Sequence, residues 1–241
     1  MTPRRLAVKA LMHQEQAGYA NLVLDAELKK CTPALDGRDA AFVTRIFYTV
    51  LEYQPLLDFL LDRFSKKPVA KLDAPVRAIL RAGLAQARYM DVPLPAAVNE
   101  SVKLTKAMGK TSASGMVNAV LRRAAVLPVR QEDFRDPLER LQIYDCLSRS
   151  VAALLYREYG EEAFAIAEAF RNRPVSAVRV NTLCTDDQAL TKELQAEGHT
   201  VHPGPWSHAL MVEFQGSPAS GQAFAQGKYH VQGLASQFAA L

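Results

Sequence analysis

The stretch from Pro75 to Ala125 decides the fold, and it reads PVRAILRAGLAQARYMDVPLPAAVNESVKLTKAMGKTSASGMVNAVLRRAA. Two patterns of helical periodicity are joined by a Pro-rich elbow at residues 91–95, and a third pattern follows a turn rich in Gly, Thr and Ser. Apolar residues recur at the spacing of a buried helix face, which predicts helices packed around a core. Basic residues run through the same helices, at Arg77, Arg81, Arg88, Lys103, Lys106, Arg122 and Arg123. A helical core that also concentrates positive charge is typical of a protein that binds a polyanion, RNA or DNA.

Helical periodicity continues toward the N-terminus. A helix is expected after the Thr2–Pro3 start, and a short helix over Leu22–Lys30. A long helix opens at Asp36, and Pro55 is expected to end it, with a separate helix over residues 56–64.

Polar residues mark the starts of the later helices. Asp73 is expected to cap the helix that contains Pro75, and Ser112 or Ser114 to cap the last one. The pattern predicts about seven helices joined by short turns, an all-helical bundle over residues 1–126.

The second half changes character. Residues 127–147 are charged and weakly periodic, which indicates a linker with room for one helix. The α/β segment is expected over residues 148–241, and it opens with a helical hairpin over residues 150–171. A strand is expected at Ala177–Asn181, and the other expected elements are a helix over 186–197 and strands at 199–202 and 210–214. The predicted fold class is mainly α: a helical bundle, then a small α/β segment of RRM or ferredoxin-like type with a helical lead-in.

Positive charge is confined to the first half. Residues 1–125 carry 19 Lys and Arg against 11 Asp and Glu, whereas residues 126–241 carry 10 against 14. The two balances, +8 and −4, give the net charge of +4. Polyanion binding is therefore expected in the first half.

Composition also limits the class of protein. No apolar run approaches the ~20 residues that a bilayer span needs, so no membrane association is expected. Cys31, Cys146 and Cys184 are scattered and form no CxxC motif, which argues against a disulfide framework and a zinc site. The sequence predicts a soluble protein of the reducing cytoplasm that binds neither a membrane nor a metal.

The basic N-terminal start is the first candidate binding site. Arg4, Arg5 and Lys9 lie in the first turns of the expected helix, where cations oppose the helix dipole. Contact with RNA phosphates and a solvated helix end are both open interpretations. The unfavourable placement slightly favours contact with RNA.

Two further sets of arginines are candidates in the first half. Arg77, Arg81 and Arg88 are four and seven residues apart and form one stripe, either an RNA-binding ridge or a set of partners for Asp73 and other acids. Arg122 and Arg123 end the last helix, where cations also suit the dipole, so RNA contact and simple helix-end stabilisation are equally open. The remaining basic side chains of this region are more typical of a solvated face, namely Lys103, Lys106 and Lys110.

In the second half, Arg179 and Asn181 flank Val180 on one face of the expected strand. Contact with RNA or a partner domain, and a structural role within the sheet, are equally open for this pair. Cys184 has no neighbouring base and is expected to be inert. Three histidines surround Trp206 without a carboxylate or thiol at ligand spacing, which favours a loop surface: His199, His202 and His208.

The order of these segments resembles a known arrangement. The pieces RRLAVKALMHQ, LDFLLDRF, RAILRAGLAQARYMDVPLPAAVNESVKLTK and SASGMVNAVLRR resemble a NusB-type RNA-binding domain. LLYREYGEEAFAIAEAFRNRPVSAVRVNTL, LTKELQAEGHTV and FAQGKYHVQGLASQFAAL are similar to the segment that precedes the catalytic domain of the Sun/RsmB family, the 16S ribosomal-RNA cytosine-C5 methyltransferases. This resemblance implies ribosomal RNA as the partner, and RNA contact at the basic start of the first helix.

The resemblance also implies parts that are not found in the sequence. Members of the family carry a DxCAAPGGK-type loop for S-adenosylmethionine and catalytic cysteines, and neither is recognised here. The expected function is therefore that of an RNA-binding, substrate-orienting portion of such an enzyme, truncated and catalytically incomplete, with no cofactor of its own. The alternatives are a NusB-type transcription antitermination factor and a protein-interaction module, and only the last predicts binding that is insensitive to salt.

Overall fold

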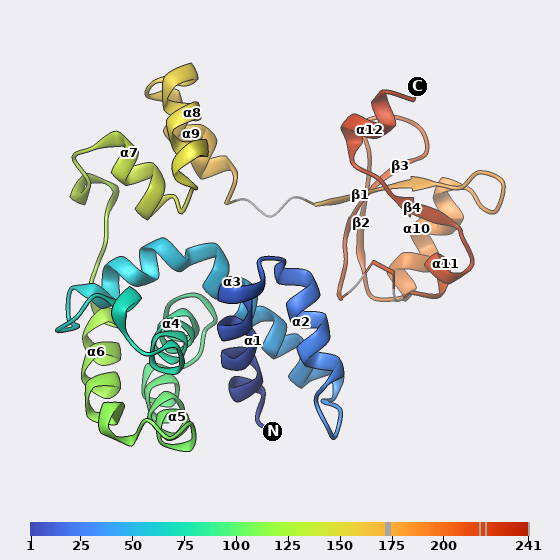
Figure 1. The fold of residues 1–241 in the computed structure, drawn as a ribbon. Coiled ribbons are helices and arrows are strands. Elements are labelled where there is room, and N and C mark those ends of the chain that lie inside the picture. The colour runs from blue at the N-terminus through green and yellow to red at the C-terminus, as the bar shows by residue number, and fades with distance from the viewer. Residues whose placement is uncertain (172–174, 217, 220, 241) are drawn as a thin grey trace. The chain divides into compact units, whose positions relative to one another are not determined.

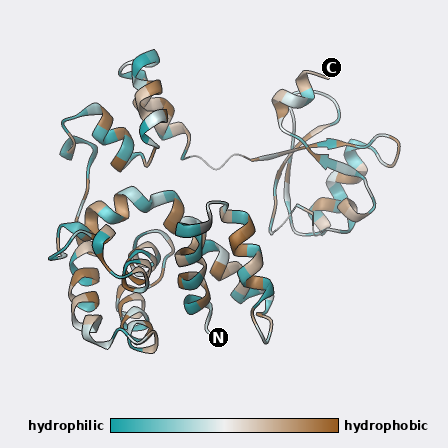
Figure 2. Cartoon of the chain, viewed as in Figure 1, coloured by the Kyte–Doolittle hydropathy of each residue, from teal (hydrophilic) through white to brown (hydrophobic). Residues whose placement is uncertain are grey.

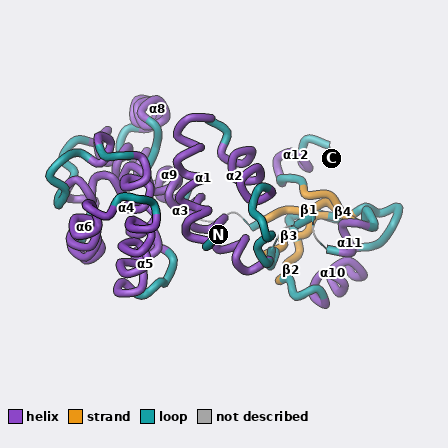
Figure 3. Tube along the Cα trace, turned by 60° about the horizontal axis from the view of Figure 1, so that its bottom comes forward, coloured by secondary structure: helices purple, strands orange, loops and turns teal. Residues whose placement is uncertain are grey.

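The computed structural model describes residues 1–171, 175–216, 218–219 and 221–240. The chain divides into two compact units, residues 1–169 and 170–241, and each is described on its own (Figure 1). Helices form the first unit and strands occur in the second, as Figure 3 shows in purple and orange. No described helix is both long and apolar enough to cross a membrane.

Six helices form the bundle that the sequence predicted. Their apolar positions share one core, and Figure 2 shows brown, hydrophobic residues alternating with teal ones along these helices. Leu6, Phe47, Leu60, Ile79 and Leu121 are almost completely buried in it. The helices are α1 (Pro3–Ala17), α2 (Ala20–Lys29), α3 (Gly37–Asp62), α4 (Ala74–Tyr89), α5 (Leu94–Ala107) and α6 (Ser114–Val126).

The third helix corrects one prediction, because α3 continues through Pro55 without interruption. A proline inside a helix costs roughly 3 kcal/mol through its missing N–H and its clash with the preceding turn. Buried residues lie on both sides of it, including Val50 before and Leu57 after, so one apolar face spans the proline. Burial of several such side chains, each worth roughly 1.5–3 kcal/mol, outweighs the cost.

The predicted helix caps are only partly correct. Asp36 caps α3, because its carboxylate accepts a hydrogen bond from the backbone N–H of Asp39 at 2.7 Å. Asp73 precedes α4 without capping it, since its carboxylate binds Lys110 at 2.6 Å instead. Neither Ser112 nor Ser114 caps α6, because a 3₁₀ turn over Thr111–Ala113 leads directly into the helix.

Gly83 shows how closely α4, α5 and α6 approach one another. A β-carbon at this position would lie 2.5 Å from Ser101 Oγ and 2.9 Å from Leu121 Cδ1. At these distances the side chains of Ser101 and Leu121 would have to shift to make room for a β-carbon. The glycine therefore permits the tight packing of the bundle.

The segment predicted as a linker, residues 127–147, contains short helical turns, and its Phe134 packs on the bundle. Phe134 is 7% exposed and lies 5.1 Å from the ring of Phe59, which fixes the segment to α3. Helices α8 (Arg149–Tyr159) and α9 (Glu162–Ala169) share a small core with Leu141. This part of the chain also contains a 3₁₀ turn at Gln131–Asp133, the short α7 (Pro137–Glu139) and a π-helical turn at Arg140–Tyr144.

The division into units therefore differs from the predicted boundaries at residues 126 and 147. The helical hairpin α8–α9, which was expected to belong to the α/β segment, packs within the first unit. Where independently folding domains begin and end stays a prediction.

The second unit is a four-stranded antiparallel sheet with the strand order β2-β3-β1-β4. The chain order strand–helix–strand–strand–helix–strand with this spatial order is ferredoxin-like, as predicted. Strand β4 and the short helix α11 were not anticipated. The elements are β1 (Ser176–Val180), α10 (Asp187–Ala196), β2 (Thr200–Pro203), β3 (Ala209–Glu213), α11 (Gln222–Ala225), β4 (Tyr229–Val231) and α12 (Leu234–Phe238).

One face of this sheet packs on helix α10. Val178 and Val180 of β1 are buried with Leu190 and Leu194 of α10. Arg179, between the two valines, is exposed, which confirms the predicted alternation along the strand. The sheet therefore presents Arg179 away from the core.

Candidate nucleic-acid interface

The start of α1 carries three cations, and the structure separates them. The Thr2 hydroxyl accepts a hydrogen bond from the backbone N–H of Arg5 at 3.4 Å and so caps the helix. Arg4 Nε donates to Gln86 Oε1 at 2.7 Å, and the Arg4 guanidinium lies 5.0 Å from the centroid of the Phe42 ring. Arg4 is therefore used to hold α1 against α3 and α4.

The side chains of Arg5 and Lys9, unlike that of Arg4, are not used to hold the described helices together. Arg5 is exposed and Lys9 half-buried, and neither side chain has an acidic partner among the described residues. Both remain available to a phosphate.

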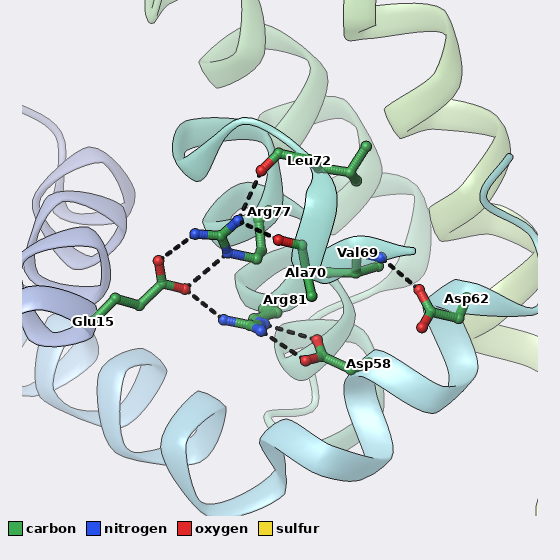
Figure 4. A network of polar contacts seen from close by, with 8 residues as sticks. All are labelled: Glu15, Asp58, Asp62, Val69, Ala70, Leu72, Arg77 and Arg81. Carbon is green, nitrogen blue, oxygen red and sulfur yellow. Dashed lines mark hydrogen bonds and ion pairs between the residues drawn. The ribbon is translucent and has the colours of Figure 1, made fainter. Parts of the chain in front are cut away.

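The two arginines near the start of α4 belong to a polar network in the first unit (Figure 4). Arg81 is 6% exposed, and its Nε and Nη2 donate to both carboxylate oxygens of Asp58 at 2.7 and 2.6 Å. Its Nη1 donates to Glu15 at 2.7 Å. Arg77 binds the same carboxylate, because its Nε and Nη2 donate to the two Glu15 oxygens at 2.9 and 2.5 Å. The network thus joins α1, α3 and α4.

The network also lowers the pKa of the Glu15 carboxyl. The hydrogen bond from Arg77 is the largest cause that holds the pKa of the Glu15 carboxyl below its usual value, while burial acts in the opposite direction. The same hydrogen bond raises the pKa of Arg77. Of the two interpretations of the stripe, the structure favours partners for acids, although the acids are Glu15 and Asp58 instead of Asp73.

Arg88, the third arginine of the stripe, completes the end of another helix. Its Nη1 donates to the carbonyl oxygens of Ala124, Ala125 and Leu127 at 3.2, 3.2 and 2.8 Å. These carbonyls lie at the C-terminus of α6, where no backbone partner is available within the helix. The side chain therefore seals the end of α6.

Arg122 and Arg123 lie on the outside of α6. Arg122 is exposed and bonds only to Asn118 of its own helix, at 3.1 Å. Arg123 is exposed and places its guanidinium 4.5 Å from the centroid of the Phe64 ring, at the end of α3. Neither arginine has an acidic partner in the described part of the chain, so both keep their charge toward solvent.

The lysines of α5 and its following turn are mostly paired. Lys103 binds Glu100 at 2.8 Å and Lys110 binds Asp73 at 2.6 Å, and these bonds are the largest cause that lowers the pKa of each carboxyl. Lys106 is exposed. This face agrees with the interpretation of a solvated surface.

Four cations that were not singled out from the sequence follow α3. Arg63, Lys66, Lys67 and Lys71 are exposed and form no ion pair with any described acid. The Lys66–Lys67 pair in a polar turn was the signal available in the sequence.

In the second unit, Arg179 and Asn181 line one open groove of about 540 Å³ at the end of β1. The Asn181 amide donates to the Gly227 carbonyl at 2.8 Å, and its oxygen accepts from the N–H of Leu183 at 3.2 Å. Asn181 therefore shapes the loop after β1, whereas exposed Arg179 lies opposite His230 in the sheet register. Leu183, 95% exposed, projects from the same loop.

Two of the three histidines near Trp206, His199 and His208, have structural partners. His208 binds Asp187 through its Nδ1 at 2.9 Å and its backbone N–H at 3.0 Å. Burial acts to raise the pKa of Asp187, but the hydrogen bonds from His208 outweigh it and the net shift is downward. His199 lies 3.7 Å from Glu197. Within the described ranges, no group of three or more His, Cys, Asp or Glu side chains is arranged to hold a metal.

Two protein-family models match this chain. Residues 1–126 match the NusB family, and residues 151–217 match the ferredoxin-like domain described as Methyltr_RsmF/B-like. The chain belongs to the NusB family in its first half and continues into an RsmF/B-type ferredoxin-like domain.

Relatives that match most of this chain belong to one kind of methyltransferase. Ribosomal RNA small subunit methyltransferase B of Xylella fastidiosa (strain Temecula1) is 31% identical over 98% of this chain, and that of Xanthomonas campestris is 32% identical over 90%. The alignments cover 53% and 48% of those proteins, so the chain spans about half the length of the curated relatives it matches. The predicted resemblance to the Sun/RsmB family is confirmed.

Two other similarities agree with this result. Transcription antitermination protein NusB of a Shewanella species is 32% identical over 49% of this chain and is itself 88% covered. The crystal structure of PH0851 superposes on all of this chain with a TM-score of 0.66 at 19% identity, which shows the shared fold.

Proposed function

We propose that this chain binds a structured region of small-subunit ribosomal RNA and orients it so that a cytosine can be methylated at C5. The observation that carries the proposal is the contrast between α1 and α4: Arg5 and Lys9 have no acidic partner among the described residues, whereas Arg77 and Arg81 are paired with Glu15 and Asp58. Free cations on a NusB-type bundle suit phosphate contacts, which supply affinity without reading sequence.

Other exposed cations are proposed as further, separate RNA contacts. Arg122 and Arg123 on α6 belong to the proposed set in the first unit, and Arg179 belongs to it in the second. Arg4, Arg77, Arg81 and Asn181 serve the proposal indirectly, because their polar groups already hold the fold together.

S-adenosylmethionine is the methyl donor that the methyltransferase relatives imply. A cofactor of this kind is bound where a Gly-rich turn joins a strand to a helix, so that backbone N–H groups approach it closely. The connection from β1 to α10 reads NTLCTD and contains no glycine. These residues do not fit the cofactor, and no step of the methyl transfer is assigned to them.

The test is a fluorescence anisotropy titration of the chain with stem-loop fragments of small-subunit ribosomal RNA at two salt concentrations. The variant Arg5→Ala/Lys9→Ala is compared with Lys29→Ala/Lys103→Ala, which removes equal charge from residues already paired with Asp25 and Glu100. We expect the slope of log K against log salt to fall by about 0.7–0.9 for each phosphate that the first variant no longer neutralises.

Binding that is insensitive to salt, or equal in the two variants, would contradict the proposal. Salt-insensitive binding would favour the protein-interaction alternative. Binding only to an antitermination RNA, with no affinity for ribosomal fragments, would favour the NusB-type factor.

A further inference from the structure

A groove lies at the end of α3, in the first unit, at a distance along the chain from the basic start of α1. It has a volume of about 470 Å³ and is lined by the last turn of α3, the segment after α6 and one residue of the following 3₁₀ turn. The lining residues are Phe59, Arg63, Phe64, Leu127, Pro128, Val129 and Asp133. We call it the α3–α6 groove.

Two arginine–phenylalanine pairs border this groove. The guanidinium of Arg63 lies 4.6 Å from the centroid of the Phe59 ring, and that of Arg123 lies 4.5 Å from the centroid of Phe64. Phe134 supports Phe59 from the other side at 5.1 Å and is itself buried. A guanidinium held against a ring is positioned before a ligand arrives, and its planar group can stack on a nucleic-acid base.

Exposed positive charge follows Arg63, one of the lining residues, along the chain. Lys66, Lys67 and Lys71 are exposed in the turn that follows Arg63 and form no ion pair with any described acid. The acids nearby are engaged: Asp62 accepts from the N–H of Val69 at 2.6 Å. Asp133 likewise accepts from the N–H of Arg130 at 2.8 Å. Arg63 and Arg123 border the groove, and the turn that follows Arg63 adds the three lysines, of which Lys67 also acts electrostatically on Asp73.

We propose that the α3–α6 groove binds a single-stranded segment of RNA, with a base stacked at Arg63 and phosphates contacted by the three lysines. The inference rests on the proposed function of RNA binding and names a second contact site for it. A single strand fits better than a duplex, because only an unstacked base exposes the face that stacking requires. An acidic peptide would pair its carboxylates with these charges but would have no base to stack on the guanidinium plane.

The experiment compares three variants in titrations with a single-stranded RNA oligonucleotide and with an RNA duplex of equal length. Lys66→Ala/Lys67→Ala/Lys71→Ala removes the proposed phosphate contacts. Arg63→Lys keeps the positive charge but removes the planar guanidinium on which a base would stack. The control Lys29→Ala/Lys103→Ala/Arg157→Ala removes three exposed charges that are paired with neighbouring acids. Circular dichroism checks that each variant is folded.

We expect the triple-lysine variant to lower the salt slope for the single strand by about two, at about 0.7 for each phosphate. We expect Arg63→Lys to weaken single-strand binding about tenfold with an unchanged salt slope, the effect of removing one stacked base. The control triple variant and duplex binding should change little.

Equal behaviour of the triple-lysine and control variants would overturn this inference. If Arg5→Ala/Lys9→Ala still weakens binding in that case, the proposed function stands and only the second site fails. An unmodified chain that binds no RNA overturns both. A polyglutamate peptide that displaces the oligonucleotide at equal charge concentration, with Arg63→Lys having no effect, would assign the groove to an acidic peptide.

Discussion

The arginines of α4 and the cations at the start of α1 carry the same charge and have opposite environments. Arg81 is buried between Asp58 and Glu15, whereas Arg5 is exposed without an acidic partner among the described residues. The difference teaches that a basic helix face indicates a binding surface only where distant acids do not neutralise it. Burial of the pairs, and not the number of cations, decides which surface is left for a polyanion.

The largest effect that would test this contrast is on stability, from Arg81→Ala. The substitution leaves the partly buried Asp58 without its arginine and Glu15 with Arg77 alone, so we expect the free energy of unfolding to fall by about 3 kcal/mol. Arg5→Ala should change it by less than about 0.5 kcal/mol. Urea denaturation followed by circular dichroism measures both values.

Binding provides the complement to that measurement. At a temperature where both variants are folded, Arg81→Ala should bind ribosomal RNA with the affinity of the unmodified chain. Arg5→Ala should bind it more weakly. The reverse pattern would show that the network itself is the RNA-binding ridge and would break the comparison.

A smaller effect is expected from Glu15→Gln, and it depends on pH. The pKa of the Glu15 carboxyl is lower in the folded chain than its ordinary value of 4.5. Its stabilisation is therefore fully present above about pH 4.5 and is lost as the pH falls through the folded pKa. We expect Glu15→Gln to lower the free energy of unfolding by about 1.5 kcal/mol at pH 7. The reason is that the hydrogen bonds from the two arginines lose their charged acceptor.

The difference in unfolding free energy between the two proteins should shrink below pH 4.5, the ordinary carboxyl value. Denaturation curves at pH 7, 5 and 3.5 measure it. A constant difference across this range would mean that the Glu15 charge contributes nothing to the network.

The smallest effect extends the contrast to the second unit. Asn181→Ala removes the hydrogen bonds to Gly227 and Leu183 and should cost about 1 kcal/mol of stability. Arg179→Ala, two residues earlier in β1, should leave stability unchanged and lower the salt dependence of RNA binding. Thermal unfolding and anisotropy of the two variants separate the roles. Equal thermal stability of the two variants would show that Asn181 has no special part in the loop.

Periodicity and turn residues were enough to predict most of the fold. The helices of the bundle and the order strand, helix, strand, strand followed from apolar spacing, because burial of one face dominates local structure. Pro55 was misjudged since the local cost of a proline is visible in sequence, whereas the packing that offsets it is tertiary. Strand β4 was missed because its three residues, Tyr229–Val231, are too short for a pattern.

The candidate site was less predictable, for a related reason. Glu15 lies 62 residues from Arg77 in the sequence, and no local rule reports that they meet. The same limit applies to Arg4 and Gln86, which are 82 residues apart. The sequence identified which half is basic, but the pairing of individual charges depends on how the helices pack.

The seal that Arg88 places on the end of α6 has a consequence for modular architecture. The carbonyls of Ala124, Ala125 and Leu127 find their partner inside the bundle, so the last helix does not need a following segment to complete it. Such a bundle can stand alone or be joined to another domain without redesign of its core. The Shewanella antitermination protein and the Xylella methyltransferase, both similar to this chain, show these two uses of one building block.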